Sequence, residues 1–95
     1  EHYAEELSIP ELAEMLYVSP YHLCREFKKA TGKTIVQYLN MTRVLHAQRM
    51  LLETDYNITR ISKETGFSNL THFNRIFKSI AGMSPSEKRK QYKMI

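Results

Sequence analysis

Two pairs of cationic residues recur in this chain at the same spacing and in the same local sequence. Arg25 and Lys28 lie in the order H-L-x-R-x-F-K-x-x-x-G that begins at His22, and Arg75 and Lys78 lie in the matching order H-F-x-R-x-F-K-x-x-x-G that begins 50 residues later. The planar fork of an Arg matches a guanine edge, and a Lys ammonium is a point charge suited to phosphate. Apolar residues kept in both copies serve any core, whereas cations kept on the opposite side predict that both copies face one polyanion.

The repeat continues upstream at an offset of 49 residues, so a one-residue slip is expected between Ser19 and His22, at a turn. The upstream matches are Ile9 with Ile58, Leu12 with Ile61, Ala13 with Ser62, and Ser19 with Ser68. Two short helices with a small residue in the first helix and a tight turn between them describe a helix-turn-helix. Tyr17 and Gly66 fall at the two turns, where Gly suits a left-handed backbone and Tyr costs about 1 kcal/mol of strain.

Capping signals predict where each helix begins. Ser8-Ile9-Pro10-Glu11 and Ser84-Pro85-Ser86-Glu87 read as capping boxes, and Ser19-Pro20 reads as an N-cap followed by Pro. Together with Thr34, Asn57, Ser68-Asn69 and the glycines at 32, 66 and 82, they predict helices over about 9–16, 20–32, 35–53, 58–65, 69–82 and 85–93. No strand alternation is present, so the fold is predicted to be all-α, with two helix-turn-helix subdomains joined by a long linker helix.

A helical wheel assigns faces to the second helix of each unit. The inward direction is set by Leu23, Phe27 and Ala30 in one copy, and by Phe73, Phe77 and Ile80 in the other. The outward direction then carries Tyr21, Arg25 and Lys28, and Thr71, Arg75 and Lys78, flanked by Cys24, Lys29, Asn74 and Ser79. This is the composition expected of two recognition helices, with Ser19 and Ser68 marking helix N-termini whose free amides bind phosphate.

The linker helix, residues 35–53, is expected to act as a rigid spacer. Its apolar face is predicted to carry Val36, Leu39, Ala47, Met50 and Leu51. At 1.5 Å per residue it runs roughly 28 Å, close to the roughly 34 Å between successive major-groove faces of a duplex. One chain would then read two groove segments, and its target would be a direct, asymmetric site.

Composition and charge narrow the class of protein. Residues 1–26 hold six acids and one base (net −5), whereas residues 27–95 hold 13 bases and four acids (net +9). A basic body with an acidic leading edge suits nucleic-acid binding. The chain has no membrane-spanning run, no secretory signal and one cysteine, Cys24, so a cytoplasmic location and a reduced thiol are expected. The start at Glu1 suggests a piece of a longer protein.

The sequence lacks the motifs that would indicate catalysis, cofactor binding or metal binding. It contains no glycine-rich phosphate loop, nucleophile elbow or obvious carboxylate pair, so we expect neither an enzyme nor a cofactor. The four histidines show no i, i+4 pairing, which argues against a metal site. His22 and His72 are alternatively local packing or capping groups, and Glu26 and Glu64 are candidate ion-pair partners for the two arginines. Arg43, in the linker helix, is a candidate for bracing the two halves by an internal ion pair. The basic tail is a candidate for either phosphate contact or plain solubilising charge.

The sequence resembles the DNA-binding domain of the arabinose-regulator (AraC/XylS) family over essentially its whole length. The match lies in L-A-E-M-L-Y-V-S-P-Y-H-L-C-R-E-F-K-K-A-T-G, in Y-L-N-M-T-R-V-L-H-A-Q-R-M-L-L, and in the string from I-S-K-E-T-G-F-S-N to G-M-S-P-S-E-K-R-K. The family helix before the first unit is largely missing, and Lys88 stands where the family usually has Tyr. The resemblance implies one domain over residues 1–95, with helix-turn-helix units at about 8–32 and 57–82, a linker at 35–53 and a basic helix at 85–93.

The resemblance also implies a partner and roles for individual residues. The partner is double-stranded promoter DNA, with RNA polymerase and a regulatory domain upstream of this chain as further expectations. Base contacts are expected from Tyr21, Cys24, Arg25, Thr71, His72 and Arg75. Phosphate contacts are expected from Ser19, Lys28, Lys29, Ser68, Asn74 and Lys78. The alternative is a helical protein-interaction module that uses the acidic early segment or the linker helix to dock polymerase or another regulator.

Overall fold

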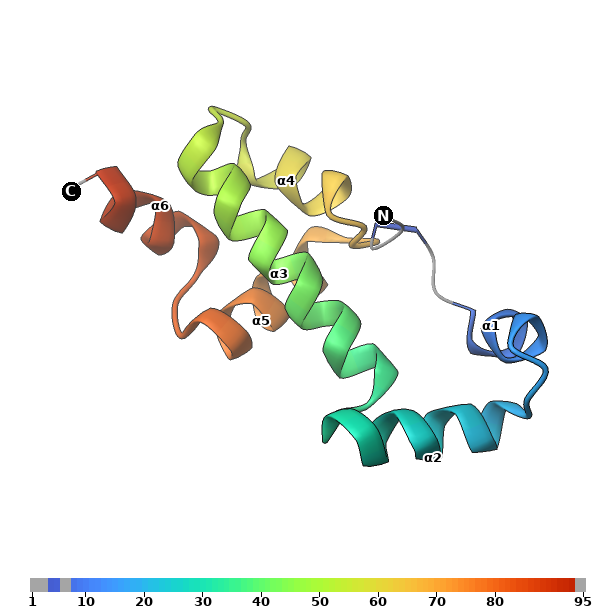
Figure 1. The fold of residues 1–95 in the computed structure, drawn as a ribbon. Helices are drawn as coiled ribbons and strands as arrows, with labels where there is room; N and C mark the ends of the chain where they lie inside the picture. Colours follow the sequence, from blue (N-terminus) through green and yellow to red (C-terminus); the bar gives the residue numbers. More distant parts are fainter. Residues whose placement is uncertain (1–3, 6–7, 94–95) are drawn as a thin grey trace. The chain divides into compact units, whose positions relative to one another are not determined.

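The computed structural model describes residues 4–5 and 8–93, in which the regular structure is six α-helices and no strand (Figure 1). In chain order they are α1 (Ile9–Met15), α2 (Pro20–Thr31), α3 (Ile35–Glu53), α4 (Ile58–Glu64), α5 (Leu70–Ala81) and α6 (Pro85–Lys93). The predicted all-α fold with two helix-turn-helix subdomains and a long linker helix is confirmed. No helix in this part of the chain has the length and apolarity that crossing a membrane requires.

The chain divides into two compact units, and the division falls within α3. The N-terminal unit is Glu6–Leu39, with α1, α2 and the first residues of α3. The C-terminal unit is Glu1–Glu5 with Asn40–Ile95, and holds the rest of α3 with α4, α5 and α6. Each unit therefore contains one of the two helix-turn-helix copies.

Side-chain caps begin the helices where the sequence predicts them. The Ser8 hydroxyl accepts a hydrogen bond from the Glu11 amide (3.3 Å), and the side-chain oxygen Oδ1 of Asn57 accepts one from the Arg60 amide (2.8 Å). Thr34 and Gln37 form a reciprocal box at α3, as Ser84 and Glu87 do at α6. Hydrogen bonds from Ser84 to the carboxylate lower the pKa of Glu87, so the charged form of the cap is favoured.

Both helix-turn-helix turns have the same backbone geometry. The Val18 amide donates to the Ala13 carbonyl (3.0 Å), and the Phe67 amide donates to the Ser62 carbonyl at the same distance. Ala13 and Ser62 are buried, which confirms them as the small residues of the two units. Tyr17 has a φ of 58° and Gly66 a φ of 92°, so both left-handed turns occur where they were predicted. The turn therefore tolerates a strained Tyr in one copy.

The core of the C-terminal unit is aromatic and lies between α3, α4 and α5. It consists of Val44, Ala47, Leu51, Ile61, Phe67, Phe73 and Phe77. The ring of Phe73 is 5.1 Å from that of Phe67 and 5.7 Å from that of Phe77, both in non-parallel arrangements that favour aromatic pairs. Packing of these rings fixes α5 against α3 and α4.

Burial corrects the predicted apolar faces. Val36 is 49% exposed and Ile80 is 42% exposed, while Val44 on α3 and Ile76 on α5 pack in or against the core. Ala30, predicted to face inward on α2, is also exposed. Because α3 carries apolar residues on more than one side, the wheel does not identify its core face.

The start of α5 also corrects the sequence analysis. Its N-cap is Asn69, whose side-chain carbonyl accepts from the His72 amide at 2.7 Å. Ser68 lies one residue before the cap and is exposed. Ser19 and Asn69 are thus the equivalent caps at an offset of 50 residues, and the slip falls before them, where Ser68 is the extra residue of the second turn.

Arg89 of α6 joins the end of α3 to the following loop. Its guanidinium donates to the carbonyls of Leu51 (3.3 Å), Thr54 (3.1 Å) and Tyr56. These groups are partly buried, and a cation near the last carbonyls of a helix is also favoured by the helix dipole. Arg89 therefore acts as a C-terminal cap of α3 supplied from another helix.

We expect Arg89→Met to lower the free energy of unfolding by about 2–3 kcal/mol, because the three carbonyls lose a charged donor. Urea denaturation followed by circular dichroism measures the change. Lys90→Met, at an exposed position of the same helix, is the control and should change stability by less than about 0.5 kcal/mol. Equal losses in the two variants would show that the bonds of Arg89 contribute little.

Gly66 should tolerate a side chain less well than Gly82. Both residues have positive φ, +92° and +84°, so an added methyl strains each backbone by about 1 kcal/mol. A Cβ at Gly66 would also lie 2.7 Å from the Cα and the carbonyl oxygen of Ala4, whereas one at Gly82 meets no atom within 4 Å. We therefore expect Gly66→Ala to cost at least about 1 kcal/mol more than Gly82→Ala in thermal or urea unfolding. Equal costs would mean that the Ala4 backbone moves aside freely.

Candidate nucleic-acid interface

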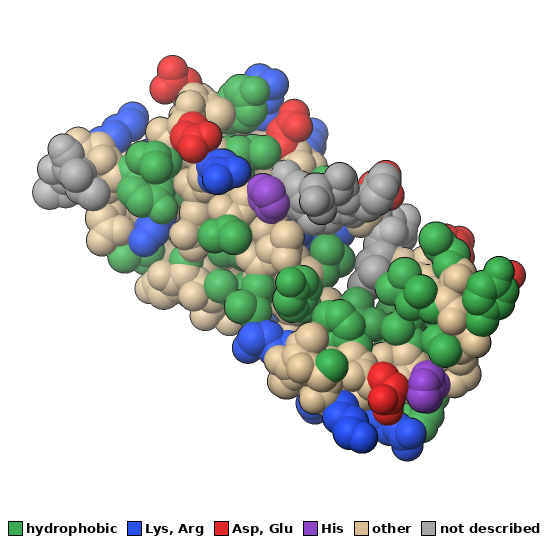
Figure 2. All heavy atoms as spheres, in the orientation of Figure 1, with side chains coloured by type: hydrophobic (Ala, Val, Ile, Leu, Met, Phe, Trp, Pro, Cys, Tyr) green, Lys and Arg blue, Asp and Glu red, His purple; other side chains and the backbone are tan. Residues whose placement is uncertain are grey.

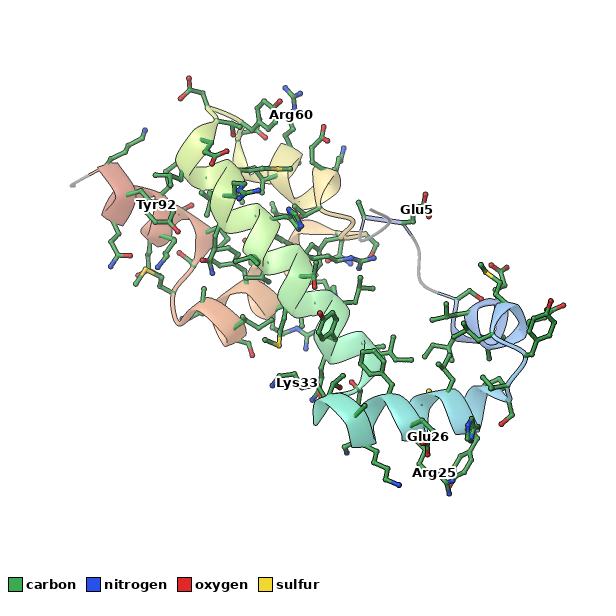
Figure 3. The ribbon with its side chains drawn as sticks, viewed as in Figure 1. Glu5, Arg25, Glu26, Lys33, Arg60 and Tyr92 are labelled. Carbon is green, nitrogen blue, oxygen red and sulfur yellow. The ribbon has the colours of Figure 1, made fainter. Side chains whose placement is uncertain are left out.

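The first candidate surface is the exposed side of α2 in the N-terminal unit. Tyr21, Arg25 and Lys28 are exposed, as the wheel predicted, while Leu23 and Phe27 are partly buried on the other side. In Figure 3, Arg25 and Glu26 extend from the side of α2 that faces away from α1. In Figure 2, Lys and Arg side chains gather along this edge of α2. The helix therefore presents a cationic ridge to solvent.

Arg25 has two local partners on α2. Its guanidinium carbon is 5.8 Å from the centre of the Tyr21 ring, and its Nε is 3.7 Å from Oε2 of Glu26. Glu26 is therefore the ion-pair partner of Arg25 that the sequence offered. Both side chains are largely exposed, 61% and 45%, so solvent screens the pair and its strength is small. A phosphate or a base edge can compete for this guanidinium.

The second candidate surface is the exposed side of α5 in the C-terminal unit. Thr71, Arg75 and Lys78 are exposed there, with Phe73 and Phe77 fully buried beneath them. The Nη2 atom of Arg75 is 3.0 Å from Nδ1 of His72. Glu64, considered as an ion-pair partner for Arg75, instead pairs with Arg60 at 3.6 Å.

The N-termini of α2 and α5 are equivalent in their capping. The hydroxyl of Ser19 accepts from the His22 amide at 3.0 Å, as the side chain of Asn69 does from the His72 amide. Asn69 was missed as a residue of this site, although its position three residues before His72 matches that of Ser19 before His22. Both helix ends are exposed and begin the faces that carry the cations.

The remaining predicted residues flank these two faces. Lys29 and Asn74 are exposed, and Cys24 is a partly buried free thiol. Phe67 was not predicted to take part, but its ring lies 5.9 Å from that of His72. The structure thus brings Tyr21 to Arg25 and His72 to Arg75, each pair within one helix.

Arg43 was expected to brace the two halves through an internal ion pair, but the two contacts described next join parts of the C-terminal unit alone. It donates to the Glu5 carbonyl at 2.8 Å, and its guanidinium lies 5.7 Å from the centre of the Phe67 ring. Burial lowers the pKa of Arg43. These contacts connect α3 to the N-terminal segment and to the turn before α5, all within the C-terminal unit.

Chemically, the two faces offer donors and positive charge. Each has an Arg, a Lys and a capped helix N-terminus, which together are suited to phosphate oxygens and to acceptor-rich base edges. Residues 4–5 and 8–93 contain no group of three or more His, Cys, Asp or Glu side chains placed to hold a metal ion.

Comparison with known proteins finds a matching helix-turn-helix family and relatives that are named as transcription regulators. Residues 12–91 match a family described as "Helix-turn-helix domain". The chain is 36% identical over 92 residues to the bifunctional transcriptional activator/DNA repair enzyme AdaA of Bacillus subtilis, covering 97% of this chain and 44% of that protein. It is 39% identical over 88 residues to an uncharacterized HTH-type transcriptional regulator of Staphylococcus aureus, of which it covers 12%. The chain thus spans less than half the length of these curated relatives.

Solved structures share the arrangement of helices. The DNA-binding domain of AdpA, a global transcriptional factor solved with a target DNA, superposes with a TM-score of 0.91 at 31% identity, covering 98% of this chain and 84% of that one. The C-terminal domain of AraT, a response regulator from Geobacillus stearothermophilus, superposes with a TM-score of 0.88 at 30% identity, covering 96% of this chain and 75% of that one. An AraC-type regulator from Chromobacterium violaceum superposes with a TM-score of 0.83 at 30% identity, covering 94% of this chain and 80% of that one. The chain belongs to the AraC-type family of helix-turn-helix domains.

Proposed function

We propose that this chain is the DNA-binding domain of a bacterial transcription regulator and that it recognises a specific double-stranded site. The observation that carries the proposal is the duplicated exposed face of α2 and α5, each with an Arg and a Lys three residues apart on a helix fixed by the same turn. The cations of one face alone would be ordinary surface residues. Their repetition on equivalent helices favours a shared ligand with repeating negative charge.

The proposed contacts divide into base readout and phosphate binding. Base contacts are assigned to Tyr21, Cys24, Arg25, Thr71, His72 and Arg75. Phosphate contacts are assigned to Ser19, Lys28, Lys29, Ser68, Asn74 and Lys78. The exposure of both arginines supports their role, and the free amides at the N-termini of α2 and α5 add neutral donors for phosphate.

We further propose that residues 1–95 act as one domain that reads two successive major-groove segments. Helix α3, with 19 residues, is about 28 Å long and connects the two helix-turn-helix copies at 8–32 and 57–82. The helix at 85–93 adds basic residues near the second copy. A binding site of two unequal, directly repeated halves is expected.

The relatives support the wider setting of this proposal. AdpA was solved with a target DNA, and AdaA is a transcriptional activator. By analogy we propose a cytoplasmic regulator in which a separate region of a longer protein supplies the regulatory input and RNA polymerase is a partner. Any repair activity of the AdaA kind is not assigned to this chain, which we propose has no catalytic step and needs no cofactor.

A protein-docking role is the second candidate. Met41, Leu45 and Leu52 of α3 are exposed, and large exposed apolar side chains on a helix are typical of interaction surfaces. A module that docks another protein makes no phosphate contacts, so any DNA affinity it has should not change with salt concentration.

Salt titration separates the two candidates. If several lysines and arginines neutralise phosphates, the logarithm of the DNA-binding constant falls linearly with the logarithm of salt concentration, with a slope of about −0.9 for each phosphate contacted. Fluorescence anisotropy with a duplex selected from random sequences measures this slope. A flat response, or no selected sequence, would reject the DNA-binding proposal and favour docking.

A further inference from the structure

His72 is held in place from the core side of α5. Its ring lies 5.9 Å from the ring of Phe67 at an interplanar angle of 56°, and Phe67 is only 5% exposed. Arg43 lies 5.7 Å from the centre of that Phe67 ring. The orientation of His72 is therefore set by a buried aromatic ring that is itself contacted from α3.

This ring in turn contacts the guanidinium of Arg75. Nη2 of Arg75 is 3.0 Å from Nδ1 of His72. A guanidinium has donors and no acceptor, so this hydrogen bond requires an unprotonated Nδ1 and places the proton of the neutral ring on Nε2. The bond uses one of the five N–H donors of Arg75 and leaves the others for a base edge.

The first copy lacks this support. Val18 occupies the place of Phe67 before the recognition helix, and His22 is exposed. Arg25 has a carboxylate neighbour, Glu26, where Arg75 has the apolar Ile76. The guanidinium of Arg25 thus has a carboxylate beside it, whereas that of Arg75 is bonded to a neutral acceptor.

We propose that His72 acts on base recognition through Arg75, as a positioning residue, in place of the direct base contact that the family resemblance assigns to it. It acts through Nδ1, with its ring oriented by Phe67. Base discrimination by the second unit then depends on an Arg held by a neutral ring nitrogen, whereas Arg25 of the first unit lies beside Tyr21 and Glu26. This inference rests on the proposed DNA-binding function. An Arg side chain carries about 2 kcal/mol of rotamer entropy, so restricting it before binding reduces the cost of placing its fork on a base.

A double-mutant cycle tests this role on the selected duplex. The second half-site is first defined as the half whose base preference relaxes in Arg75→Ala. We then expect His72→Phe, which keeps an aromatic ring and removes the acceptor, to reduce discrimination against a single-base change there by about 3- to 10-fold. In the Arg75→Ala background the same substitution should have no further effect, because the residue that His72 positions is absent. His72→Asn, which offers an oxygen near the place of Nδ1, should retain most of the discrimination.

The equivalent substitution in the first copy is the matched control. His22→Phe should leave discrimination at the first half-site within about twofold, with or without Arg25→Ala. An equal effect of His72→Phe in both Arg75 backgrounds would show that His72 contacts DNA directly and would overturn the proposal. The same holds if His72→Phe has no effect on discrimination. If the unmutated chain shows no salt-dependent DNA binding, the DNA-binding function itself is rejected. The failure of that function is therefore distinguishable from the failure of the role proposed for His72.

Discussion

Phe77→Ala is expected to lower the free energy of unfolding by about 3–5 kcal/mol, the usual cost of truncating a fully buried Phe. The side chain of Phe77 is 0% exposed, and its ring is 5.7 Å from that of Phe73 in the core of the C-terminal unit. Removing it leaves a cavity beneath α5. Because a small domain is stabilised by only about 5–15 kcal/mol, this single change removes a large part of the total.

The repeat supplies a matched control for this prediction. Phe27 is the equivalent residue of α2, but it is only partly buried, and its ring centre lies 5.7 Å from that of Tyr38. Phe27→Ala should therefore cost less, about 1–2 kcal/mol. Urea unfolding by circular dichroism gives both values, and amide hydrogen exchange should show loss of protection in α4, α5 and α6 for Phe77→Ala but in α1 and α2 for Phe27→Ala. Equal costs would contradict the difference in packing between the two units.

Local rules predicted the helix ends well, because a cap depends on residues three positions apart. The pairs Thr34 with Gln37 and Ser84 with Glu87 each form hydrogen bonds in both directions. The left-handed turn at Tyr17 was predicted because Tyr17 aligns with Gly66 in the sequence repeat. The pair Ser68-Asn69 was correctly predicted to begin α5, but Ser68 was wrongly chosen as the residue that marks its N-terminus, because both are good capping residues. The folded backbone, and not the residue type, determines which of two adjacent capping residues is the N-cap.

The face of α3 could not be chosen from its sequence. Apolar residues lie on several sides of this helix, so Val36 and Val44 are equivalent on propensity alone. Val44 is buried because Ile61 of α4, Phe67 of the following turn and the two Phe residues of α5 form one core with it, whereas Val36 is exposed. Such contacts join residues far apart in the sequence and have no local signal.

The contacts that support the candidate interface also could not be predicted from local sequence patterns. The outward positions of Arg25 and Arg75 follow from helix periodicity and from the buried rings opposite them. The i, i+3 spacing of His72 and Arg75 allowed their contact, but its dependence on Phe67 requires the folded turn. The contact of Arg89 with carbonyls 33 to 38 residues earlier was likewise outside the reach of any pattern.

Arg25→Ala combined with Arg75→Ala is expected to give the largest loss of specific DNA binding. Each substitution alone should cost about 1–3 kcal/mol and relax base preference in a different half-site. The two residues lie in different units and have different partners, Glu26 and Tyr21 for one and His72 for the other. Their effects should therefore add to about 2–6 kcal/mol, roughly a 30- to 10⁴-fold weaker complex. Anisotropy titrations at one fixed salt concentration measure all three variants.

Conservative variants separate the fork of Arg from its charge. Arg25→Lys with Arg75→Lys keeps both positive charges, so the salt slope should stay near that of the parent chain while base discrimination falls. Arg60→Ala, at an exposed arginine of α4 outside both faces, should change discrimination by less than twofold. If the Lys variants discriminated as well as the parent, the arginines would act through charge alone, and sequence readout would have to reside in Tyr21, Thr71 and the residues around them.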